Sequence, residues 1–88
     1  MHAVVVRSTI QDLEEGRTFL REEVVPRVSQ APGIVAAYWV KLEGNEGTSM
    51  LVFESEEGAR AMAEQVKPPP SGAVSLDSVQ VGEVVEHA

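Results

Sequence analysis

The sequence predicts an α+β fold of the ferredoxin-like type, with a four-stranded antiparallel sheet and two helices on one of its faces. The chain of 88 residues reads as two successive strand–helix–strand units. This β-α-β-β-α-β order is typical of a split βαβ sandwich, and elements this short have one common compact arrangement. The length allows one domain, so we expect a single unit over residues 1–88.

The first strand is expected over residues 2–8, where three consecutive valines favour extended backbone. An apolar centre without alternation indicates a strand that is covered on both faces. Ser8 and Thr9 follow as candidate N-caps, because each has a suitable polar residue three positions later. We therefore expect the first helix over residues 10–29.

Two residues interrupt the regular pattern of this first helix. Its apolar stripe, spaced to face the sheet, consists of Leu13, Leu20, Val24 and Val28. Gly16 lies on the same stripe, where glycine costs about 1 kcal/mol relative to alanine. It marks a close approach of the helix to the sheet, room for a ligand, or a tolerant site without a role. Pro26 lacks an N–H group and should kink or shorten the last turns.

The middle of the chain predicts a hairpin of two strands. Strands are expected over residues 33–42 and 48–54. The loop Glu43–Gly47 between them is rich in residues that tolerate tight turns. The two strands should therefore pair side by side and antiparallel.

The last third of the chain predicts a helix, a stiff loop and a strand. Ser55 is the expected N-cap of the second helix. The buried stripe of this helix consists of Ala59, Met62, Ala63 and Val66. A proline-rich loop over residues 67–72, expected as extended surface structure, leads to a strand over residues 74–85. Gly82 interrupts that strand and is a candidate position for a bulge.

Composition narrows the range of partners. The 14 Asp and Glu residues outnumber the 7 Lys and Arg residues and give a net charge of −7. Nucleic acids and anionic membranes attract basic surfaces, so we expect neither as a partner. The apolar run Ala3–Val6 is also too short for a signal-peptide core or a membrane span. The chain has no cysteine, which fits a cytoplasmic protein without disulfides or thiolate metal sites.

Two segments resemble the dimeric α/β-barrel superfamily, and most closely its antibiotic-biosynthesis-monooxygenase-type (ABM-type) domains. The segment Ser29–Val35 is similar to the turn that precedes the second strand in that family, and Leu51–Glu57 is similar to the exit from the third strand. The resemblance implies that two subunits pack sheet against sheet and that each keeps a pocket between sheet and helices. The predicted elements also favour a homodimer. Two helices cover only one face of an apolar sheet, so a homodimer would bury the other face.

The same resemblance argues against one activity of the family. Its haem-degrading members use an Asn, a Trp and a His. By approximate alignment, this chain has Arg7 or Val6, Phe53 and Ala63 at those positions. The haem-degrading set is therefore absent, and we expect no cofactor.

Five residues are candidates for a pocket: Arg7, Gly16, Tyr38, Trp39 and Phe53. Tyr38 and Trp39 are adjacent on a strand, so they should point to opposite faces of the sheet. The one on the helix side would line a pocket or simply pack in the core. Arg7 would bind a ligand carboxylate, or pair with a nearby acid.

Neither the histidines nor the paired acids predict a catalytic or metal site. His2 and His87 lie near the chain ends without an evident orienting partner. The acidic doublets, such as Glu56-Glu57, are adjacent on helices and do not face each other. We expect a homodimeric module that binds a small apolar or aromatic ligand, or serves interactions, without a recognisable catalytic set. The alternative is a cofactor-independent monooxygenase or isomerase acting on an aromatic or polyketide-like small molecule.

Overall fold

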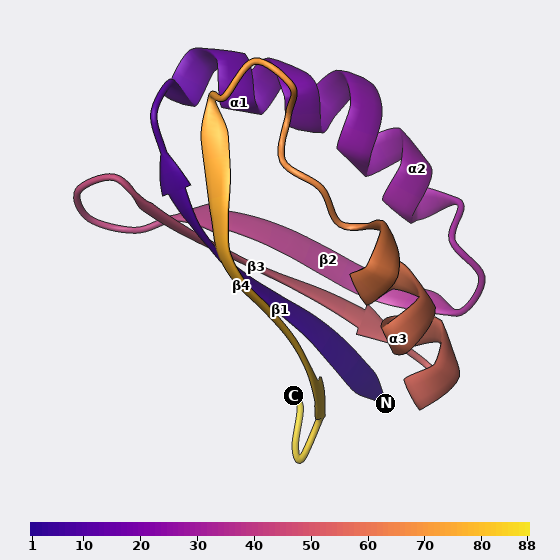
Figure 1. The fold of residues 1–88 in the computed structure, drawn as a ribbon. Coiled ribbons are helices and arrows are strands. Elements are labelled where there is room, and N and C mark those ends of the chain that lie inside the picture. The colour runs from indigo at the N-terminus through magenta and orange to yellow at the C-terminus, as the bar shows by residue number, and fades with distance from the viewer.

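The computed structural model describes all residues 1–88 and confirms the ferredoxin-like fold (Figure 1). The strands are β1 (His2–Ile10), β2 (Ile34–Lys41), β3 (Glu46–Phe53) and β4 (Val74–Glu83). They form one open antiparallel sheet in the order β2-β3-β1-β4, with the helices on one face. The first helix consists of three successive segments, α1 (Leu13–Phe19), η1 (Leu20–Val24) and α2 (Val25–Ser29), and the second is α3 (Glu56–Gln65).

The first helix begins later than expected, and its N-cap is a different residue. Ser8 and Thr9, the predicted caps, both lie inside β1, which stays paired with β4 up to Ile10. The cap is Asp12, whose Oδ1 accepts a hydrogen bond from the backbone N–H of Glu15 at 3.1 Å. Pairing with β4 therefore extends the strand past the first polar residues that would otherwise start a helix.

Pro26 does not end the first helix, which continues to Ser29. The turn before the proline is wider than an α-helical turn: residues Leu20–Val24 form a π segment, and the N–H of Val25 bonds to the carbonyl of Leu20. A π-type bond spans five residues instead of four. Pro26 then falls at the first positions of α2, where its missing N–H group leaves few bonds unmade.

The irregular point of β4 lies near its middle and not at Gly82. Gly82 pairs regularly with Ala3. The pairing shifts between Arg7 and Ser8, which face Ser78 and Leu76, so that Asp77 is the extra residue. The Oγ1 of Thr9 donates a hydrogen bond to the Asp77 carboxylate at 2.8 Å. β4 then ends at Glu83, two residues before the predicted end of the strand.

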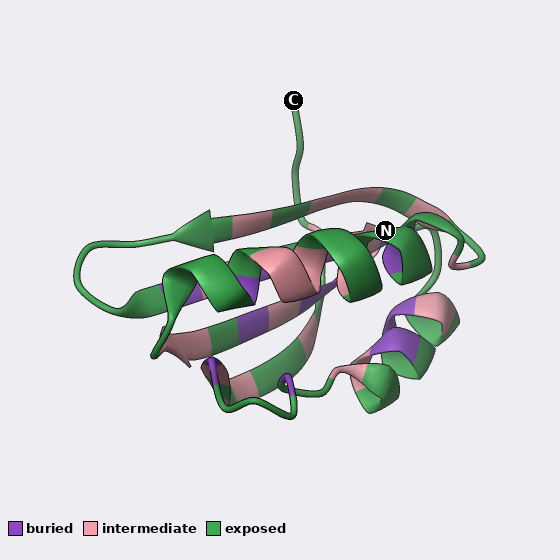
Figure 2. Ribbon diagram, turned by 90° about the horizontal axis from the view of Figure 1, so that it is seen from above, coloured by how far each residue is buried: buried purple, intermediate pink, exposed green.

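The core lies between the sheet and the helices, towards the end of the sheet that α3 covers. Phe53 and Val4 are its largest fully buried side chains. α3 packs on β1, β3 and β4, and α2 packs on β2. Ser55 is the N-cap of α3 as predicted, since its Oγ accepts the N–H of Gly58 at 3.1 Å. Figure 2 shows buried positions on one side of α3 and on the strands beneath the helices.

The opposite face of the sheet carries no helix. The strand register places Tyr38, Met50 and Val5 side by side on it, across β2, β3 and β1. Tyr38 is 65% exposed and Met50 is 46% exposed. One face of the sheet is therefore covered within the chain and the other is an exposed surface with large apolar side chains. No helix of the protein is long and apolar enough to cross a membrane.

Candidate functional site

A cavity of about 630 Å³ lies between the first helix and the sheet and is partly open to solvent. The first helix forms its roof. All four strands contribute to its floor, and the end of α3 with the proline loop after it forms one side. Figure 1 shows this loop running from α3 up to the start of α1, where the carbonyl of Ala73 accepts the N–H groups of Gln11 and Asp12. The loop thus closes a wall between two elements that are far apart in the sequence.

The cavity exists because the sheet carries small residues beneath the first half of the helix. Ser8 pairs with Gly47, and Val6 pairs with Ser49, all on the face that looks towards the helices. At the other end of the sheet the corresponding positions hold larger side chains, Leu51 and Phe53, and the core is filled. A row of serine and glycine leaves volume that a row of leucine and phenylalanine would occupy.

The roof of the cavity is held close to the sheet at one point. Gly16 is buried in α1, and a methyl group there would lie 3.1 Å from the Cγ2 atom of Val74 in β4. Past this contact the helix carries larger apolar side chains, and 14 of the 27 lining residues are hydrophobic. The apolar lining includes Leu13, Phe19, Leu20 and Val24 from the roof and Val6, Trp39, Leu51 and Leu76 from the floor.

The polar part of the lining consists of hydroxyl, amide and cationic groups. Ser8 and Ser49 bring hydroxyls and Gln65 brings an amide. Ser49 is a buried polar residue, only 8% exposed. Four cations complete the lining: Arg17, Arg27, Lys41 and Lys67. Hydroxyls and amides orient a ligand by hydrogen bonds, and cations attract its negative charge.

The structure separates the five predicted site residues into three places. Gly16 and Trp39 line the cavity. Phe53 is 1% exposed and sits deeper, between the core and a second, smaller pocket of about 450 Å³. Arg7 and Tyr38 lie on the uncovered face of the sheet, since their register partners in β3 are Thr48 and Met50. Tyr38 and Trp39 thus point to opposite faces as predicted, and the ligand-binding role of all five residues stays a prediction.

Sequence reasoning missed most of the polar lining. Ser8 was expected to cap a helix, and the proline loop was expected to lie on the surface; Pro69 is in fact buried, and all three prolines line the cavity. The four lining cations are dispersed along the chain and carry no motif. The strand register and the path of the proline loop bring these polar and basic residues to one cavity.

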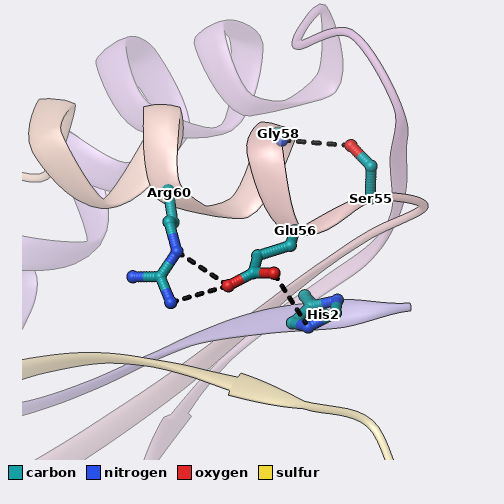
Figure 3. A network of polar contacts seen from close by, with 5 residues as sticks. All are labelled: His2, Ser55, Glu56, Gly58 and Arg60. Atoms are coloured by element: carbon teal, nitrogen blue, oxygen red, sulfur yellow. Dashed lines mark hydrogen bonds and ion pairs between the residues drawn. The ribbon is translucent and has the colours of Figure 1, made fainter.

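A separate polar network joins the start of α3 to the start of β1 (Figure 3). Nε and Nη2 of Arg60 both donate to Oε2 of Glu56, at 2.9 and 2.7 Å, and Nε2 of His2 lies 3.9 Å from Oε1 of Glu56. The hydrogen bond and charge of Arg60, with a smaller contribution from His2, hold the pKa of the Glu56 carboxyl below its ordinary value of 4.5. Glu56 lines neither described pocket, so this network serves to join two elements.

No group of three or more His, Cys, Asp or Glu side chains is placed to hold a metal ion. The four basic residues of the lining stand in contrast to the network at Glu56, where charges of both signs are paired.

These features define an α+β protein of the ferredoxin-like class with a cavity under its first helix. A solved structure with the same fold is that of a dimeric ferredoxin-like protein from an uncultured marine organism. It is 16% identical to this chain, with a TM-score of 0.60, and the match covers 100% of this chain and 98% of the other. No family model matches the sequence, and no curated protein matches it. The comparison establishes the fold.

Proposed function

We propose that this protein is a homodimer related to the dimeric α/β-barrel proteins, and that it binds a small apolar or aromatic molecule in the cavity under its first helix. The observation that carries the proposal is the cavity itself. Its volume of about 630 Å³ lies within the range of roughly 300–1,000 Å³ that small-molecule sites occupy. Its mostly apolar lining with a few converging polar groups is also typical of such sites.

The positions of two candidate catalytic groups favour binding over catalysis. The guanidinium of Arg7 and the hydroxyl of Tyr38 were the side chains best suited to act on a substrate, and neither residue lines the cavity. Trp39, which does line it, offers an aromatic face and an N–H group. Such groups hold a ligand in place without transferring protons.

The uncovered sheet face supports the dimer. Tyr38 and Met50, which pair across β2 and β3 on this face, are 65% and 46% exposed. A contiguous apolar surface of this kind marks an interaction site. The solved protein with the same fold is dimeric, which agrees with a homodimer here.

The binding proposal is tested by titrating the protein with decanol, an uncharged apolar probe, and following the fluorescence of Trp39. Trp39 is the only tryptophan and lines the cavity, so its emission reports on occupancy. We expect a saturable change in the native protein and weaker binding in Ser49→Phe, whose ring would take up part of the cavity from the floor. Met50→Phe is the matched control, because Met50 neighbours Ser49 in β3 and points to the opposite face.

Native mass spectrometry of the gently purified protein tests the same proposal without a chosen probe. A dimer with extra mass that Ser49→Phe lacks would support it. A native protein whose Trp39 fluorescence does not respond to decanol would contradict it.

A further inference from the structure

The charged residues of this protein are divided unevenly between the cavity and the rest of the surface. Four of the 7 Lys and Arg residues line the cavity, and none of the 14 Asp and Glu residues does. The protein as a whole carries a net charge of −7. The cavity therefore forms a positive region in a negative molecule.

The four cations come from four separate segments that surround the cavity. Arg17 belongs to α1, Arg27 to α2 and Lys41 to the end of β2, and Lys67 follows α3. No single helix face or loop explains their gathering, since they are spread over fifty residues of sequence. It is the fold that places them at one cavity.

None of the four cations is neutralised by a carboxylate. The ion pairs of the protein are those of Glu56 with His2 and Arg60. Lys41 bonds only to neutral groups: its Nζ donates to the backbone carbonyls of Leu42 and Gly44, at 3.3 and 3.2 Å. A bound anion would thus meet positive charges that have no competing partner within the chain.

We propose that the ligand of this cavity is an amphipathic organic acid, with an apolar body beneath the first helix and a carboxylate that pairs with cations of the lining, which are Arg17, Arg27, Lys41 and Lys67. This rests on the proposed function, and adds to it the charge of the ligand. The apolar lining favours burial of a hydrocarbon or aromatic body. Guanidinium and ammonium groups form the strongest hydrogen bonds to carboxylates and attract them over several ångströms.

The charge of the ligand is tested with three probes that share one hydrocarbon tail: decanoate, decanol and decyltrimethylammonium. Each is titrated into the purified protein at low and at high salt, with Trp39 fluorescence as the measure of binding. We expect decanoate to bind most tightly and the cationic probe most weakly. Salt should weaken decanoate binding and leave decanol binding almost unchanged, because ions screen charges and not apolar contacts.

Substitutions assign the preference to these side chains. Arg17→Gln and Arg27→Gln should each weaken decanoate binding about two- to fivefold, the usual effect of one partly solvated charge pair, without changing decanol binding. Arg21→Gln is the matched control, because Arg21 lies on the same helix and does not line the cavity. It removes the same charge from the protein and should change neither affinity.

Three other results of these titrations would each contradict a different part of the proposal. Equal binding of the three probes would overturn the inference about charge and leave the binding function intact. A preference for decanoate that survives Arg17→Gln/Arg27→Gln and Lys41→Gln/Lys67→Gln would overturn its assignment to these cations. A protein that responds to none of the probes would overturn the proposed function as well.

Discussion

A methyl group on Gly16 would lie 3.1 Å from Cγ2 of Val74, closer than nine in ten such contacts in proteins. Val74 is the first residue of β4 and pairs with Ile10, the last residue of β1. The glycine therefore lies at a close approach between the roof of the cavity and the sheet. Of the readings open from sequence, the close approach of helix to sheet is the one that this contact supports.

Gly16→Ala should destabilise the protein by about 1 kcal/mol. Alanine favours a helix by about 1 kcal/mol over glycine, but overpacking against Val74 costs about 1–3 kcal/mol. In a Val74→Ala background the contact is gone, and Gly16→Ala should then stabilise by about 1 kcal/mol. Urea unfolding of the four proteins measures this change of sign. If Gly16→Ala stabilises equally in both backgrounds, the close contact has no energetic weight.

Tyr38→Glu and Met50→Glu should convert the proposed homodimer to monomers while the fold is kept. A charge at the centre of an apolar sheet-to-sheet contact loses its hydration without gaining a partner, and central contacts are worth enough to raise the dissociation constant about thirtyfold or more. Native mass spectrometry and light scattering report the mass, and circular dichroism reports the fold. Val85→Glu is the control, since Val85 follows β4 and is 89% exposed. A native protein that is already monomeric would contradict the dimer.

Glu56→Gln should reduce stability at neutral pH and have no effect in acid. Because Arg60 and His2 lower the pKa of Glu56 in the folded state, its carboxylate stabilises the fold above the ordinary pKa of 4.5. That contribution is lost as the pH falls through the lowered pKa. Urea unfolding midpoints of the two proteins should therefore differ near neutral pH and converge in acid. Glu57→Gln, which removes a neighbouring carboxylate without an ion pair, should show no such convergence.

Asp12→Ala should destabilise the protein by about 1 kcal/mol, the usual cost of losing an N-cap. Asp12→Asn should cost far less, because asparagine also accepts a hydrogen bond from the backbone at this position. Thermal unfolding distinguishes the two variants. Equal losses in both would mean that Asp12 acts through its charge and not through its bond to the N–H of Glu15.

The order of elements and most of their bounds could be predicted from sequence, since hydrophobic periodicity and turn residues act locally. The cap of the first helix could not. Ser8 and Thr9 are good caps by local rules, but pairing with Leu76 and Ser75 of β4, 68 and 66 residues later, keeps them in the sheet. A contact between residues this far apart in the chain cannot be predicted from the sequence around Ser8 and Thr9.

The orientation of Trp39 shows the same limit at the candidate site. Alternation along a strand separates Tyr38 from Trp39, but the surrounding residues are apolar on both faces and do not say which one meets the helices. The strand register places Trp39 on the helix side, because Trp39 pairs with Ser49, and Ser49 pairs with Val6. The cavity depends on the same register, which brings small residues from separate strands into one row.

The division of charge also shapes the kinetics of binding. With four of the 7 bases at the cavity, three remain among the 14 acids of the outer surface. An approaching anion is repelled over most of the molecule and drawn in at one opening, so diffusion is steered towards the cavity mouth. Arg17→Gln should consequently slow the arrival of an anionic ligand more than it hastens its departure.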